Sequence, residues 1–136
     1  MNRRMDQLSG GDPAMGFELV AASIRADASD LKTFLDVLAV KLEQALPGMV
    51  FIEREGGLFK RERKVRVIRI QIEDKLYDLA RAGGGLEARL SHQVRGITLK
   101  NEVLNLDSWI TELSHHLSRH AASSAEARAA LERLVT

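Results

Sequence analysis

The sequence has 136 residues, of which 45% are apolar, 29% charged and 4% aromatic. This length suits a single globular domain, because a chain of this size buries roughly two thirds of its unfolded surface and needs no disulfide or metal to hold a core. The net charge of +1 gives no overall preference for nucleic acid or an anionic membrane. The absence of cysteine excludes disulfides, thiol catalysis and Cys-ligated zinc.

The first sixteen residues carry Arg3 and Arg4, but the apolar stretch of about 7–15 residues that a secretory signal needs does not follow them. We expect a flexible segment over 1–16 and one α+β domain over 17–136. No run approaches the roughly 18 consecutive apolar residues of a membrane span. The expected protein is therefore soluble and cytoplasmic.

The first clear element is a long helix over residues 30–46. Apolar residues recur at spacings of three and four, Asp30 is a candidate N-cap, and Pro47 with Gly48 ends the pattern. The segment that precedes it, 17–24, is interpreted as a short strand or an extended arm.

From Met49 the apolar pattern alternates, which predicts a meander of five strands. The predicted strands cover 49–55, 64–73, 75–81, 86–95 and 97–103. The second is apolar on both faces, with Val65 and Val67 on one face and Ile68, Ile70 and Ile72 on the other. Such a strand is either central and covered on both sides or gives one face to a partner subunit.

Two helices follow the strands. Asp107 or Ser108 is the expected cap of the first, and Ser123 with Glu126 has the spacing of a capping box for the second. The predicted fold class is α+β: an antiparallel sheet of about five meandering strands packed on a long N-terminal helix, with two C-terminal helices at an edge or on the opposite face.

Three of the four histidines, His115, His116 and His120, lie close together in the first of these helices. Glu112, His116 and His120 recur every four residues, and two histidines at that spacing can share a metal. The usual third or fourth ligand is missing, so we interpret the cluster as a solvated polar face and predict neither a metal nor a cofactor.

The segment 54–69 has a local excess of basic residues, among them Lys60, Arg61, Arg63 and Lys64. A basic hairpin can bind a nucleic-acid groove or an anionic surface. Charged loops also keep hairpins soluble, and the chain offers few aromatic residues for base stacking. Nucleic-acid binding is therefore the second hypothesis rather than the first.

A third hypothesis is a small enzyme or ligand carrier with a pocket between helix and sheet. Asp78 and His92 are expected to point inward, and a buried Asp beside a His is a candidate acid–base pair. The run Gly83-Gly84-Gly85 joins two strands, so we interpret it as a hairpin turn rather than a phosphate loop. No hydrolase or metalloprotease motif is present, and we predict no catalytic residue.

The preferred hypothesis is a non-enzymatic protein-interaction module, such as an adaptor, an accessory protein or a chaperone-like protein. Its expected partners are a second copy of the chain, which makes a homodimer through an apolar sheet face, and another protein. Val67, Ile68 and Ile70 are the expected interaction residues, unless they belong to the core.

Overall fold

The computed structural model describes residues 13–27, 30–56, 64–123 and 125–135. In these ranges four helices accompany a five-stranded antiparallel sheet, which confirms the α+β class. The elements in chain order are α2 (Pro13–Asp27), α3 (Leu31–Ala45), β1 (Val50–Arg54), β2 (Val65–Ile72), β3 (Lys75–Ala82), β4 (Gly85–Val94), β5 (Ile97–Leu104), α4 (Leu106–Ala121) and α5 (Ala125–Val135).

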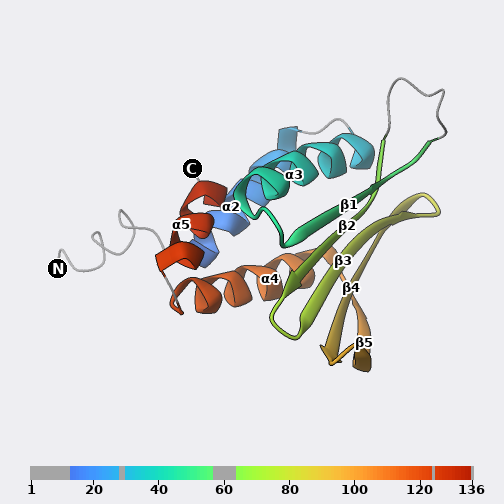
Figure 1. The fold of residues 1–136 in the computed structure, drawn as a ribbon. Coiled ribbons are helices and arrows are strands. Elements are labelled where there is room, and N and C mark those ends of the chain that lie inside the picture. Colours follow the sequence, from blue (N-terminus) through green and yellow to red (C-terminus); the bar gives the residue numbers. More distant parts are fainter. Residues whose placement is uncertain (1–12, 28–29, 57–63, 124, 136) are drawn as a thin grey trace.

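The sheet is a meander in which each strand pairs with its neighbours in sequence, in the order β1-β2-β3-β4-β5. The described helices all lie on one side of it (Figure 1). The C-terminal helices α4 and α5 therefore join α2 and α3 on the same face, and their predicted place at an edge or on the opposite face was wrong. β1 and β5 are left as the two edge strands.

A register shift in β2 changes the predicted faces of that strand. Glu53 pairs with Val67 and Arg54 with Val65, so Arg66 is an extra residue on β2. Such a bulge resets the alternation, and Val65 is fully buried together with Ile68 and Ile70. Val65 and Val67 thus do not share a face as predicted, and Val67 is partly buried on the opposite face of the sheet.

The helix predicted over 30–46 is α3, and the side chain of Asp30 accepts a hydrogen bond from the Thr33 N–H at 2.8 Å. It is not the first helix of the chain. Residues 17–24, predicted to be a strand or an extended arm, lie within α2, which begins at Pro13. Residues 13–16 of the predicted flexible segment are therefore helical, whereas residues 1–12 lie outside the described residues.

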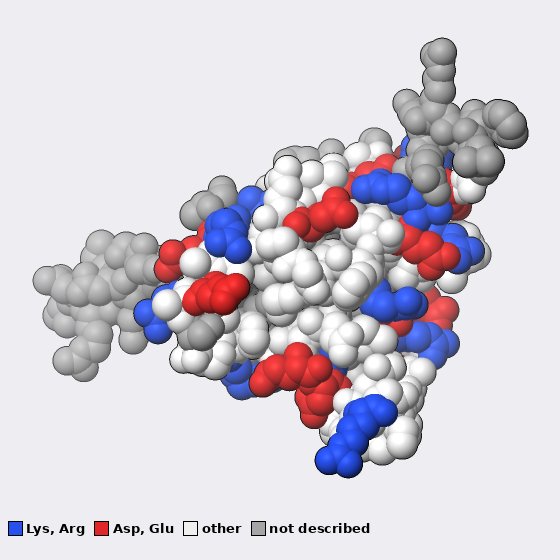
Figure 2. All heavy atoms as spheres, in the orientation of Figure 1, with Lys and Arg blue, Asp and Glu red and all other residues white. Residues whose placement is uncertain are grey.

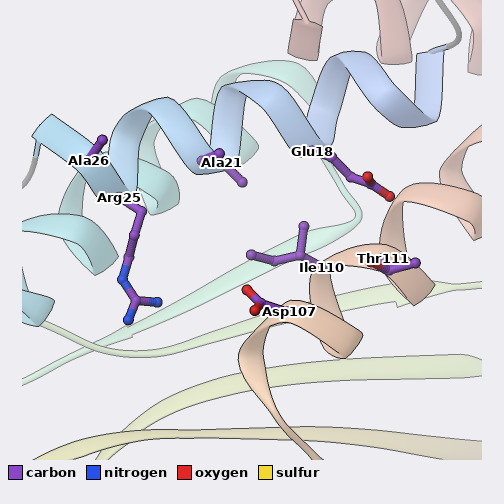
Figure 3. Close-up of a pocket in the computed structure, with 8 residues that line it drawn as sticks. Glu18, Ala21, Arg25, Ala26, Asp107, Ile110 and Thr111 are labelled. Carbon is purple, nitrogen blue, oxygen red and sulfur yellow. The ribbon is translucent and has the colours of Figure 1, made fainter.

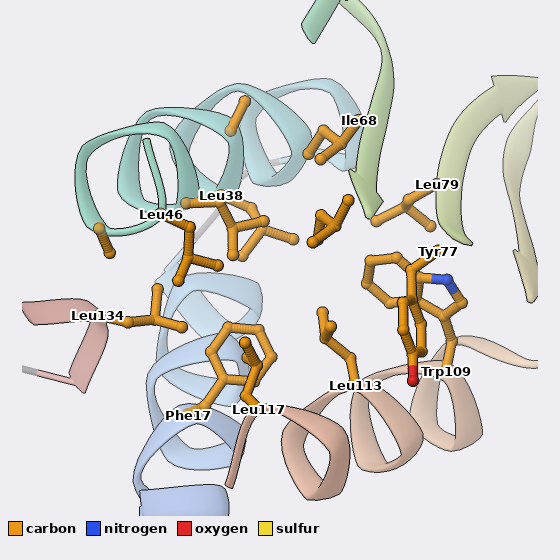
Figure 4. Close-up of a cluster of buried hydrophobic side chains, with 14 of the residues drawn as sticks. Phe17, Leu38, Leu46, Ile68, Tyr77, Leu79, Trp109, Leu113, Leu117 and Leu134 are labelled. Atoms are coloured by element: carbon orange, nitrogen blue, oxygen red, sulfur yellow. The ribbon is translucent and has the colours of Figure 1, made fainter. Parts of the chain in front are cut away.

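The core fills the space between the helices and the sheet (Figure 4). Phe17 of α2 is completely buried, as are Leu38 of α3 and Leu134 of α5. Tyr77 of β3 and Trp109 of α4 meet edge to face, with ring centroids 6.3 Å apart. The Trp109 indole N–H also donates to the Arg89 carbonyl of β4 at 3.1 Å, so α4 is held to the sheet by both apolar and polar contacts.

Candidate functional site

The most exposed apolar surface of the described chain lies on the hairpin of β4 and β5. Among the described residues eight large apolar side chains are exposed, and four of them, Val94, Ile97, Leu99 and Val103, belong to this hairpin. Ile97, Leu99 and Val103 are 64%, 62% and 58% exposed. Figure 2 shows mostly uncharged atoms over the lower end of the hairpin, with a basic side chain at the tip. An edge strand that keeps such residues in water is typical of a binding surface.

The local sequence explains why this hairpin forms. Arg95 and Gly96 join the strands, with φ values of 54° and 79°. Two successive residues of positive φ make the tight turn that matches the twist of paired strands. β5 then runs to Leu104. The next residue, Asn105, is the N-cap of α4, and its side chain accepts a hydrogen bond from the Ser108 N–H at 2.8 Å. The outer edge of β5 is thus free of the described helices (Figure 1).

The face of the sheet away from the helices is mixed in character. One row of directly opposed residues crosses it from β1 to β5: Phe51, Arg69, Asp78, Arg89 and Val103. Within the row the Arg69 guanidinium donates to the Asp78 carboxylate at 2.9 Å. The charged centre of this face has apolar residues, Phe51 and Val103, at both ends. It is polar in the middle, so its apolar character is concentrated at the edges.

Two of the three predicted interaction residues are in the core. Ile68 and Ile70 are completely buried beneath the helices, and only Val67 belongs to the open face. The alternation in β2 indicated two apolar faces, but the most exposed apolar side chains of the described sheet are on β5. Ile97, Leu99 and Val103 all lie within the strand predicted over 97–103, but alternation alone does not show which of them the helices cover.

A buried hydrogen-bond chain links β3, α4 and the turn between β2 and β3. The Tyr77 hydroxyl lies 2.8 Å from His116 Nδ1, and His116 Nε2 lies 2.8 Å from Glu73 Oε1. The carboxylate can only accept, so Nε2–H donates to Glu73, and in the neutral ring Nδ1 then accepts from Tyr77. Burial raises the pKa of the Tyr77 hydroxyl, and the nearby Glu112 carboxylate adds to that increase.

Asp74, the residue after Glu73 in the turn between β2 and β3, forms a hydrogen bond with His92. His92 Nε2 donates to Asp74 Oδ2 at 2.7 Å, and this hydrogen bond lowers the pKa of the Asp74 carboxyl. Glu73 and Asp74 are consecutive, so one turn is attached to α4 through His116 and to β4 through His92. Glu73 has a φ of 54°, an unfavourable backbone for a residue with a side chain, and its bond to His116 helps to hold it there.

The predicted pocket pair is not brought together. Leu90 lies opposite the buried Tyr77 on the helix side of the sheet. His92 is two residues further along β4, so it is on the same side. Asp78 pairs with Arg89 on the opposite face, so its expected inward orientation was wrong. The parity with Leu76 and Ala80 was read correctly, but Tyr77 and Leu79 are the residues of β3 that enter the core.

The histidines of α4 also differ in their burial. His116 is buried, and the prediction of a solvated face was wrong for this residue, whereas His115 is exposed. His116 follows Leu113 by three residues and Trp109 by seven, so helical spacing alone places it on the buried stripe. Among the described residues, no group of three or more His, Asp or Glu side chains is placed to hold a metal ion.

The central part of the predicted basic hairpin, residues 57–63, lies outside the described residues. That holds for Lys60, Arg61 and Arg63, while Lys64 is described and exposed. Arg66 of β2 forms an ion pair with Glu53 of β1, and Arg81 of β3 forms one with Glu55. These acidic partners reduce the positive charge that the described part of this region offers to a nucleic acid, and the hairpin hypothesis itself stays a prediction.

A groove of about 560 Å³ separates α2 from α4 (Figure 3). Its polar groups are Glu18 and Arg25 of α2 with Asp107 and Thr111 of α4, and three alanines line the α2 side. The Arg25 guanidinium also lies 5.6 Å from the centre of the Phe34 ring. The groove contains neither Asp78 nor His92, so it does not supply the predicted acid–base pocket.

No protein-family model matches this chain, and no curated protein or solved structure matches it either. None of the described helices is long and apolar enough to cross a membrane.

Proposed function

We propose that this protein is a non-enzymatic interaction module, of the adaptor, accessory or chaperone-like kind, that binds another polypeptide along the outer edge of β5. One observation carries the proposal: half of the exposed large apolar side chains of the described residues lie on the β4 and β5 hairpin, and β5 is an edge strand. An unpaired edge offers backbone hydrogen bonds to an extended chain, and its side chains select the sequence that pairs with it.

The absence of acid–base geometry supports a binding role over a catalytic one within the described residues. The buried Tyr77 and His116 pair is enclosed by the core and used in hydrogen bonds between elements. Asp78 is engaged by Arg69 on a face that His92 does not share. In contrast, Ile97, Leu99 and Val103 are apolar and yet largely exposed to water.

The test is a selection of strand-forming peptides. A phage library of random octapeptides is panned against the protein, and the binding of enriched synthetic peptides is measured by biolayer interferometry. We expect these peptides to lose binding to a Leu99→Lys, Val103→Lys variant, because two lysines replace the apolar residues of the edge. The matched control is Val37→Lys, Val40→Lys, which changes two comparably exposed apolar residues on α3 and should bind as the unmodified protein does.

Circular dichroism on both variants confirms that each is folded. Peptides that bind equally to the β5 variant, or a library that yields no binder to the unmodified protein in its monomeric form, would contradict the proposal.

A further inference from the structure

We infer that the partner which fits the β5 edge is a second copy of the same chain, paired antiparallel with Asn101 on the two-fold axis. This inference rests on the proposed function and names its partner. It comes from the order of side chains along β5, which reads Ile97, Thr98, Leu99, Lys100, Asn101, Glu102, Val103 and Leu104.

Symmetry restricts the possible registers. A two-fold that joins two identical edge strands into one continuous sheet is perpendicular to the sheet and makes the strands antiparallel. Directly opposed residues in such a pair point to the same face, and faces alternate along a strand. One residue on the two-fold axis must therefore lie directly opposite its own copy, because an axis between two residues would oppose neighbours that point to different faces. Near the middle of β5 the choices are Lys100, Asn101 and Glu102.

Charge then selects one of the three. With Lys100 or Glu102 on the axis, that residue opposes its own copy and places like charges together. With Asn101 on the axis, Lys100 opposes Glu102 of the second copy twice, once on each side of the axis. Neither side chain has an ion-pair partner within the described residues, so both are free for this pairing. Opposite charges directly across strands stabilise a pair, and like charges destabilise it.

The apolar residues agree with the same register. Val103 of the second copy then lies beside Leu99, the extra residue where the register of β5 shifts, so that two of the most exposed apolar side chains of each chain come close together. The three central pairs use residues 100–102, which follow the irregularity in β5 where His92 pairs with Lys100 and Gln93 with Thr98. A lone lysine on an edge strand usually prevents pairing. A lysine and a glutamate arranged symmetrically about a neutral residue instead make the edge complementary to itself.

The dimer is tested first by exchanging charges. Lys100→Glu places glutamates opposite each other in a homodimer, and Glu102→Lys does the same with lysines. We expect each variant alone to raise the dimer dissociation constant by about tenfold or more. A mixture of the two, one of them isotope-labelled, restores both Lys–Glu pairs and should yield heterodimers of near-wild-type affinity. Sedimentation velocity measures the affinities, and native mass spectrometry identifies the mixed species.

The register is tested with single cysteines, which the chain otherwise lacks. Opposed residues have Cα atoms about 4.5–5.5 Å apart, within the range of a disulfide. Asn101→Cys should therefore form a disulfide-linked dimer under mild oxidation. The matched control is Thr98→Cys, also exposed on β5, which in this register lies about 20 Å from its own copy and should not link.

The outcomes separate this inference from the proposed function. A chain that stays monomeric, charge variants that dimerise like the unmodified protein, a mixture that gives no heterodimer, or equal linking of both cysteine variants would each overturn the dimer. If peptides still bind at β5 in that case, the edge receives a foreign strand and the proposed function stands. If they do not bind either, both conclusions are wrong.

Discussion

The Tyr77 hydroxyl forms a hydrogen bond with the His116 ring in a buried position. Tyr77→Phe should lower the free energy of unfolding by about 1–3 kcal/mol, because Nδ1 is left without a hydrogen bond where water does not replace it. Urea denaturation followed by circular dichroism measures the change. Glu73→Gln is the control, since its amide oxygen can still accept from Nε2 at a largely exposed site. An equal or larger loss in the control would contradict this account of the chain.

A second consequence at this scale concerns acid. The hydrogen bond from His92 holds the pKa of Asp74 below its ordinary value of 3.8, so the ionised carboxylate is favoured in the folded state. Its contribution to stability is therefore complete above about pH 4 and is lost as the pH falls through the lowered pKa. Asp74→Asn should flatten the dependence of the unfolding midpoint on pH in this acid range. The Thr33 N–H lowers the pKa of Asp30 in the same way, so Asp30→Asn is the comparison. An unchanged pH profile for Asp74→Asn would refute the assignment.

At the scale of elements, the start of α4 depends on its N-cap, Asn105. Asn105 satisfies the Ser108 N–H, one of the helix donors that lack an internal partner. Asn105→Ala should cost about 1 kcal/mol of stability, and Asn105→Asp, which keeps the accepting oxygen, should cost little. Thermal unfolding of both variants provides the measurement. A similar loss in both would show that the cap contributes nothing.

The elements also show what alternation and spacing can and cannot reveal. The strands were predicted within a few residues, because each alternates and ends at a Gly or charged turn. Helix α2 was missed, although Phe17, Ala21 and Ile24 have helical spacing, because the stripe they make is narrow and Ala21 is small. The predicted cap of α4, Asp107 or Ser108, was wrong, because the helix already begins at Leu106 and its N-cap is Asn105.

The candidate site was less predictable than the elements for a physical reason. Alternation reports which residues share a face, but it does not report which face the helices cover. Asp78 was therefore predicted to point inward on β3, whereas Tyr77 is the residue that enters the core. Likewise, the exposure of β5 depends on its position at the edge of the sheet, which follows from the full strand order.

At the scale of the whole molecule, one core joins the sheet to all the described helices. Trp109, the only tryptophan, is completely buried in it. Its fluorescence should therefore be blue-shifted, and its change on denaturation should coincide with the loss of circular dichroism, as expected for a single cooperative unit. Two separated transitions would show that the helices and the sheet unfold independently.

The nearest-neighbour order of the strands has a consequence for how the chain reaches this structure. From β2 to β5 each strand follows the one before it after two residues, so these pairings require only local encounters. The helix layer differs, because Gly16 of α2 packs against Val135 of α5, at the other end of the sequence, and a Cβ at Gly16 would lie only 3.2 Å from that side chain. Contacts between distant parts of a chain carry the larger entropic cost of loop closure and form slowly. We therefore expect strand pairing to precede the closure of α5 on α2 during folding.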